Sequence, residues 1–155
     1  MSIDQEVAAL ARVPMLKGVE QGKLRLLAFT SERVVFRPDE LLCKQGDMGD
    51  KAYIILSGEA DIIVDTDAGP KVVANVGQND IVGEIAIISN VPRTATVKAT
   101  AEVQALTVSK DHFLKFMREF PEMAIEVMRV LAARLENTTR DLAEVRGKLA
   151  AAGNG

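Results

Sequence analysis

The central part of the chain carries short apolar runs separated by turn-forming residues. Between residues 31 and 109 each run spans four to six positions, and clusters of Gly, Asn, Asp and Pro stand between the runs. This spacing predicts about eight short strands at roughly ten-residue intervals, which is typical of an antiparallel sandwich, a jelly roll or a small barrel. The runs are 33–36, 41–44, 52–56, 60–64, 71–76, 95–99 and 103–108.

Both ends of the chain change to the period of helices. At the N-terminus, Asp4 is the expected cap of a helix over about 4–12, and a second short helix is expected over about 21–29. After the strands, Ser109 is the expected cap of a helix over 110–120. The expected segments are N-terminal helices (1–30), a strand region (31–109), C-terminal helices (110–149) and a disordered tail (150–155).

The last predicted helix, from Pro121 to about Leu149, repeats apolar residues at alternating intervals of three and four. This heptad pattern is typical of a helix that packs along a second helix, and Thr138 is its one polar member. A parallel helix pair, and hence a homodimer, is one interpretation, and the frayed end of a monomer is the other. The seam consists of Met128, Leu131, Leu135, Thr138, Leu142, Val145 and Leu149.

The totals exclude several classes of protein. With 155 residues and a hydrophobic fraction of 48%, the chain is long enough for one domain with a core. Its net charge of −3 does not suit a nucleic-acid binder, and no apolar run approaches the roughly 20 residues that cross a bilayer. One cysteine, one histidine and an acidic start predict a cytoplasmic protein without a disulfide, a metal site or a signal peptide.

Candidate chemistry concentrates between Gly83 and Ala95. A glycine that permits close approach of the backbone is followed by Glu84, an apolar helical turn, and then Arg93 and Thr94. Lone charges beside an apolar turn are costly unless something pairs them. A ligand with sugar hydroxyls and a phosphate would pair both, because arginine and a helix N-terminus attract phosphate while a carboxylate accepts hydroxyl hydrogens. The other interpretation is a Glu84–Arg93 salt bridge that ties a loop.

Two further segments precede this stretch: 46–50 reads Gly-Asp-Met-Gly-Asp, and 53–58 reads Tyr-Ile-Ile-Leu-Ser-Gly. Taken in order with 83–95, they resemble the strand-and-turn signature and the phosphate-binding cassette of the cyclic-nucleotide-binding domain family. The resemblance covers about residues 36–142, and Asn79 stands where the family usually has glycine. It implies a mainly β fold with flanking α-helices. That fold is an eight-stranded antiparallel jelly roll (double-stranded β-helix) with N-terminal helices, a short phosphate-binding helix and a long C-terminal helix.

The resemblance also implies roles for single residues. Glu84 and the Gly83 backbone would take the ribose 2′-hydroxyl, and Arg93 would hold the cyclic phosphate. Backbone amides at Ile85 and Ala86 would add to the anion site. The hydroxyl of a threonine beside the arginine would reach the phosphate and the amino group of a syn guanine. The implied cyclic nucleotide site is Gly83, Glu84, Ile85, Ala86, Arg93, Thr94 and Ala95.

A base pocket and a lid follow from the same resemblance. Strand residues would face the base, although ordinary core packing also explains them. The stretch 134–139 resembles the bacterial catabolite activator branch, in which a Thr-Ser pair, one residue from each subunit, reaches the purine amino group and an arginine supports the ribose and the glutamate. The match favours cAMP over cGMP, while a weak seam position is the other explanation for a threonine here. The implied residues are Ile62, Val73, Ala74, Arg134, Thr138 and Thr139.

The predicted function is a stand-alone sensor of cAMP or cGMP, without enzymatic activity, that signals through its C-terminal helices to an unidentified effector protein. The chain ends before a helix-turn-helix domain could fit, so no direct contact with nucleic acid is expected. One alternative is a nucleotide-independent dimerisation or docking module of the same fold. Another is a cupin-type enzyme, which would need a cluster of ligands that the single His112 does not supply.

Overall fold

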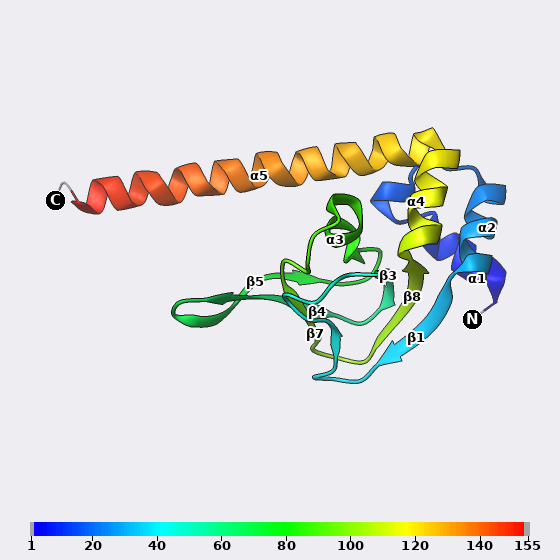
Figure 1. The fold of residues 1–155 in the computed structure, drawn as a ribbon, viewed down its shortest axis with the longest axis horizontal. Coiled ribbons are helices and arrows are strands. Elements are labelled where there is room, and N and C mark those ends of the chain that lie inside the picture. The colour runs from blue at the N-terminus through cyan, green and yellow to red at the C-terminus, as the bar shows by residue number, and fades with distance from the viewer. Residues whose placement is uncertain (1, 154–155) are drawn as a thin grey trace.

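The computed structural model describes residues 2–153 as a β-roll with helices at both ends (Figure 1). Eight strands form two four-stranded antiparallel sheets, in the orders β1-β8-β3-β6 and β2-β7-β4-β5. This is the predicted eight-stranded jelly roll, and that prediction is confirmed. The strands are β1 (Glu32–Phe36), β2 (Leu41–Cys43), β3 (Lys51–Ser57), β4 (Ala60–Thr66), β5 (Gly69–Val76), β6 (Ile81–Val82), β7 (Thr96–Ala99) and β8 (Val103–Ser109).

Seven of these strands coincide with the apolar runs of the sequence, and β6 does not. Only two residues long, β6 is too short to show a period, and its pairing with β3 through Tyr53↔Val82 and Ile54↔Ile81 defines it. The turn before β6 contains Asn79 at φ +74°, the left-handed conformation for which asparagine is tolerated. Asparagine therefore replaces the family's usual glycine without loss of the turn.

Alternation along β3 and β8 divides the core into two clusters. Ile55 and Ala105 are paired across these strands and belong to a cluster with residues of the second sheet. The neighbouring pair, Ile54 and Leu106, belongs to the cluster that the helices cover. The first sheet is therefore buried on both faces, which explains why the run in β3 is continuously apolar rather than alternating.

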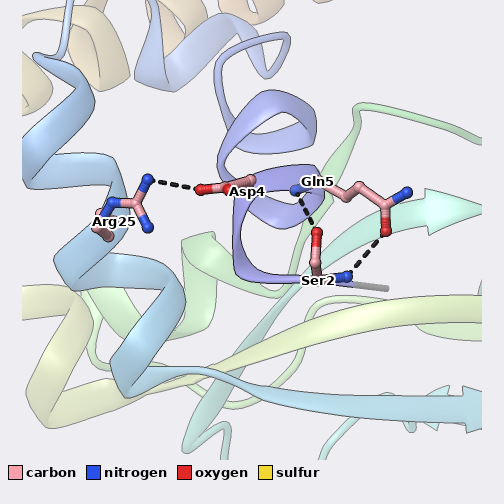
Figure 2. A network of polar contacts seen from close by, with 4 residues as sticks. All are labelled: Ser2, Asp4, Gln5 and Arg25. Atoms are coloured by element: carbon pink, nitrogen blue, oxygen red, sulfur yellow. Dashed lines mark hydrogen bonds and ion pairs between the residues drawn. The ribbon is translucent and has the colours of Figure 1, made fainter.

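The N-terminal helices are α1 (Ile3–Leu10), the short 3₁₀ helix η1 (Pro14–Leu16) and α2 (Gln21–Thr30). The prediction that Asp4 caps the first helix is wrong, because Asp4 lies inside α1 and Ser2 has the extended backbone of an N-cap. Ser2 and Gln5 form a reciprocal capping box (Figure 2). Asp4 instead accepts a 2.6 Å bond from Arg25 of α2 and so ties the two helices together (Figure 2).

The C-terminal helices are α4 (Lys110–Glu119) and α5 (Pro121–Gly153). Ser109 caps α4 as predicted, and α5 begins at the proline. The start of α5 packs on the core and on η1, whereas every residue from Ala132 to Gly153 is exposed as the helix extends past α3 (Figure 1). No helix within residues 2–153 is long and apolar enough to cross a membrane.

The tail prediction is wrong for residues 150–153, which continue α5. Three consecutive alanines stand there, and because alanine is the best helix former, the helix continues through them. The remainder of the predicted tail, residues 154–155, lies outside the described residues.

Candidate functional site

The stretch from Gly83 to Ala95 begins with a tight turn into α3 (Glu84–Ser89) directly after β6. Gly83 caps this helix at φ +87°, a left-handed conformation that favours glycine. A Cβ atom at this position would lie 3.0 Å from the carbonyl oxygen of Lys51 and would collide with the Arg93 guanidinium. Because Gly83 has no side chain, the Arg93 guanidinium can approach its backbone closely.

Arg93 is a buried cation with 6% of its surface exposed. Its Nη1 donates to the Gly83 carbonyl at 3.0 Å and its Nη2 donates to the Lys51 carbonyl at 2.7 Å. No carboxylate lies within 4.0 Å of it among residues 2–153, so the Glu84–Arg93 salt bridge is not found. Two neutral carbonyls orient the guanidinium but leave its charge uncompensated, and a buried charge of this kind favours an anionic ligand.

The loop before β3 is shaped to accommodate this arginine. The Arg93 backbone N–H donates to the Asp47 carbonyl at 2.7 Å, and the Gly46 N–H donates to the Arg93 carbonyl at 2.9 Å. A Cβ atom on Gly49 would come within 2.8 Å of the Arg93 Nε and Cζ atoms and 2.9 Å of the Ala86 methyl. Gly49 therefore leaves space for the guanidinium, whereas Gly46 permits the left-handed backbone of the turn at φ +91°.

Glu84 is buried to 2% exposure at the first position of α3. Its Oε1 accepts a short hydrogen bond from Nη1 of Arg134, which reaches over from α5 and keeps 45% of its side chain exposed. The carboxylate therefore has a cationic partner on one side, and the ion pair connects α3 with the long helix.

These residues surround a pocket of about 450 Å³, a volume in the range of small-molecule sites. The carboxylate of Glu84 and the cations Arg93 and Arg134 line it together with apolar residues of both sheets. The structure thus brings ten of the thirteen predicted site residues to one cavity: Gly83, Glu84, Ile85, Ala86, Arg93, Thr94, Ala95, Ile62, Ala74 and Arg134.

The other three predicted residues do not line the pocket of this single chain. Val73 is the extra residue of a bulge in β5, between the pairs Ile62↔Ala74 and Ile63↔Val72, and is 59% exposed. Thr138 and Thr139 lie on the exposed part of α5, where the Thr139 hydroxyl donates to a backbone carbonyl of its own helix. Their roles at the base stay predictions.

Several residues that line the pocket were not predicted from the sequence. Cys43 on β2 has the sequence context of an ordinary core residue, yet it lines the cavity, and burial raises the pKa of its thiol while the nearby Arg93 charge partly opposes this rise. Asn75 and Asp80 also line the cavity. The feature that brings Cys43 to the cavity is the pairing of β2 with β7, the strand that directly follows the 83–95 stretch.

Within residues 2–153 no group of three or more potential metal ligands is found.

Comparison with known proteins agrees with this geometry. Residues 33–120 match the cyclic nucleotide-binding domain family. The chain is similar to a CRP-like cAMP-activated global transcriptional regulator from Mycobacterium tuberculosis, with 31% identity over 137 residues, which cover 88% of this chain and 61% of the regulator. It therefore spans less than two thirds of that relative's length.

Two solved structures are similar in fold. The catabolite activator protein of Thermus thermophilus superposes with a TM-score of 0.79 at 22% identity, covering 85% of this chain and 62% of that protein. The regulatory subunit of a cAMP-independent protein kinase A from Trypanosoma cruzi, bound to guanosine, superposes with a TM-score of 0.73 at 27% identity, covering 80% of this chain and 44% of that protein. The chain belongs to the cyclic nucleotide-binding domain family.

Proposed function

We propose that the pocket binds a purine cyclic nucleotide, with cAMP as the favoured ligand. The observation that carries the proposal is Arg93, a buried guanidinium bonded to two neutral carbonyls, with donors left for the cyclic phosphate. Glu84, at the same pocket, would accept the ribose 2′-hydroxyl, and the first backbone amides of α3, at Ile85 and Ala86, would add donors for the phosphate.

The preference for cAMP rests on Thr138 and Thr139 and on the regulator from Mycobacterium tuberculosis, whose name records activation by cAMP. Binding of guanosine, as named for the Trypanosoma cruzi protein, is the competing possibility for the ligand class. A nucleoside has no phosphate, so it would leave Arg93 with its buried charge uncompensated. The arginine therefore favours a cyclic nucleotide over a nucleoside.

We further propose that the domain acts as a sensor rather than an enzyme. Ligand contact with Glu84 would alter its ion pair with Arg134, and α5 would then change its populated position. The seam of α5 supports a homodimer, since Leu135 is 68% exposed and Leu149 is 67% exposed in the single chain. An effector protein would read the position of the helix.

Titration calorimetry with cAMP, cGMP, guanosine and 5′-AMP tests the ligand class. Loss of a charge-assisted bond of about 1.5–3 kcal/mol predicts that Arg93→Ala weakens cyclic nucleotide binding by more than about tenfold. Arg93→Lys keeps the charge but not the two-donor fork, and it is expected to fall in between. Arg129→Ala, which removes an exposed arginine paired with Glu126, is the matched control and should bind like the wild type.

Two results would contradict the proposal. If neither cyclic nucleotide binds the wild type more tightly than about 1 mM, the pocket is not a sensor site and the docking-module alternative is favoured. If guanosine binds as well as the cyclic nucleotides and is insensitive to Arg93→Ala, the ligand is a nucleoside.

A further inference from the structure

A second hollow, of about 470 Å³, lies between α1 and the first sheet. It shares no lining residue with the pocket around Glu84 and Arg93, which is called the cassette pocket below. One wall is a single face of the N-terminal segment, formed by Gln5, Ala8, Ala9 and Arg12 at helical spacing. The alanine side chains are short, so they leave space open beside this segment. The opposite face of α1 carries Val7 and Leu10, which are buried in the core.

The other wall is the helix-covered face of the first sheet, near the edge strand β1. Arg33 is paired with Leu106, and Leu106 belongs to the cluster under the helices, so Arg33 lies on that face. Gln104, two residues from Leu106 along β8, lies on the same face. Leu56, only 4% exposed, supplies the apolar part of the lining. The hollow therefore combines an apolar surface with polar side chains at the margin of the core.

The charged side chains that line this hollow are both cations. Arg12 and Arg33 both line it. Seven ion pairs form among residues 2–153, and none of them includes either arginine. No aspartate or glutamate lines it. In a chain with a net charge of −3, two unneutralised arginines from separate elements give a local positive potential.

The remaining polar groups of the hollow are glutamine amides, which add N–H donors beside their carbonyl oxygens. Gln78 and Gln104 add side-chain amides. The Oε1 atom of Gln5 is occupied by the Ser2 N–H of the capping box, which leaves the amide NH₂ of Gln5 to donate (Figure 2). The same capping box and the Asp4–Arg25 bond hold this wall in place (Figure 2).

We propose that this hollow, the α1 groove, is a second ligand site that binds a small organic anion, namely a phosphate or a carboxylate attached to an apolar group. The charged end faces Arg12 and Arg33, and the apolar group covers Leu56. A volume of about 470 Å³ suits a small metabolite rather than a folded partner.

Occupancy of the α1 groove has a route to the signalling helix. A ligand held between α1 and the sheet stabilises the N-terminal helices in their present position. Those helices contact the start of α5, since η1 packs on it and Lys23 of α2 bonds Glu122 at 2.5 Å. The α1 groove would therefore bias the same helix that the cassette pocket contacts through Arg134, and the two sites would be coupled.

Residue-resolved NMR titration of the full chain tests the site. Phenyl phosphate and benzoate are the probes, and benzyl alcohol is the neutral probe of similar shape. Saturable shifts are expected at the amides of Ala8, Ala9 and Leu56 with one or both anions, and the stronger of the two identifies the anionic group. Shifts at Gly83 to Ala86 report the cassette separately.

Combined Arg12→Gln and Arg33→Gln substitutions are expected to weaken anion binding at the α1 groove by at least about tenfold. Arg118→Gln, on α4, removes another exposed arginine without an ion pair in the described chain and is expected to leave binding within about twofold. The proposal is overturned if anion-dependent shifts occur only at the cassette, if benzyl alcohol binds as well as the anions, or if the double variant binds like the wild type.

Discussion

Glu84 and Arg134 are fifty positions apart in the sequence and form an ion pair that joins the pocket to the long helix. Glu84 is almost completely shielded from water, while Arg134 remains partly exposed. A desolvated carboxylate needs a cationic partner, so the position of α5 depends on a residue that also lines the ligand pocket. The proposed link between occupancy and helix position is therefore a direct contact.

This pair predicts an asymmetric stability effect. Arg134→Gln leaves a buried carboxylate without its cation and is expected to lower the free energy of unfolding by about 1–3 kcal/mol. Adding Glu84→Gln removes the stranded charge, so the double variant is expected to recover part of the loss. Urea unfolding measures the three variants. Arg129→Gln is the control, because its exposed pair with Glu126 contributes at most about 1 kcal/mol. An Arg134→Gln loss no larger than that of the control contradicts the prediction.

Gly49 provides a test of the space around the arginine. In Gly49→Ala the new methyl would stand 2.8 Å from the Arg93 Nε and Cζ atoms, so the guanidinium must shift. We expect nucleotide affinity to fall by about fivefold or more, with a loss of about 1–3 kcal/mol in the free energy of unfolding from overpacking. Gly22→Ala is the control, since a methyl added there would have no neighbouring atom within 4 Å and α2 tolerates alanine. Equal affinity of Gly49→Ala and the wild type would show that the arginine has room to spare.

Cys43 reports both pH and ligand occupancy at the pocket. Burial raises the pKa of its thiol, so the reactive thiolate forms at a higher pH in the folded chain than in the unfolded chain. The pH at which iodoacetamide reacts half-maximally is therefore expected to be higher in buffer than in urea. Because the neutral thiol is favoured by folding, this group's contribution to stability is lost as the pH rises through the alkaline range.

The same thiol also reports the ligand. A nucleotide in the pocket would cover Cys43, so cAMP is expected to slow alkylation, and the chain's single cysteine makes the signal specific. Equal rates with and without saturating nucleotide would place the bound ligand elsewhere.

Local patterns predicted the elements of this fold, but long-range contacts determined the site. Gly83, Glu84 and Arg93 were found because they lie within one short stretch whose composition is unusual. Cys43 was missed because its relevance depends on the pairing of β2 with β7, which no local period reveals. The alternative interpretation, a Glu84–Arg93 salt bridge, rested on proximity in the sequence, but the carboxylate pairs with Arg134 on α5, a residue that only the family resemblance placed beside the glutamate.

The seam of α5 yields the last prediction, on assembly. Leu142 is 51% exposed in the single chain, and its neighbour Ala143 is also exposed but lies off the seam. If two α5 helices pair, Leu142→Asp places a charge in the apolar interface, whereas Ala143→Asp places the same charge on the solvent side at a similar cost in helix propensity. Sedimentation equilibrium is expected to show a dimer for the wild type and Ala143→Asp and a monomer for Leu142→Asp. A wild-type chain that remains monomeric at high concentration, with and without nucleotide, would rule out the parallel pair and leave the exposed half of α5 without a self-association role.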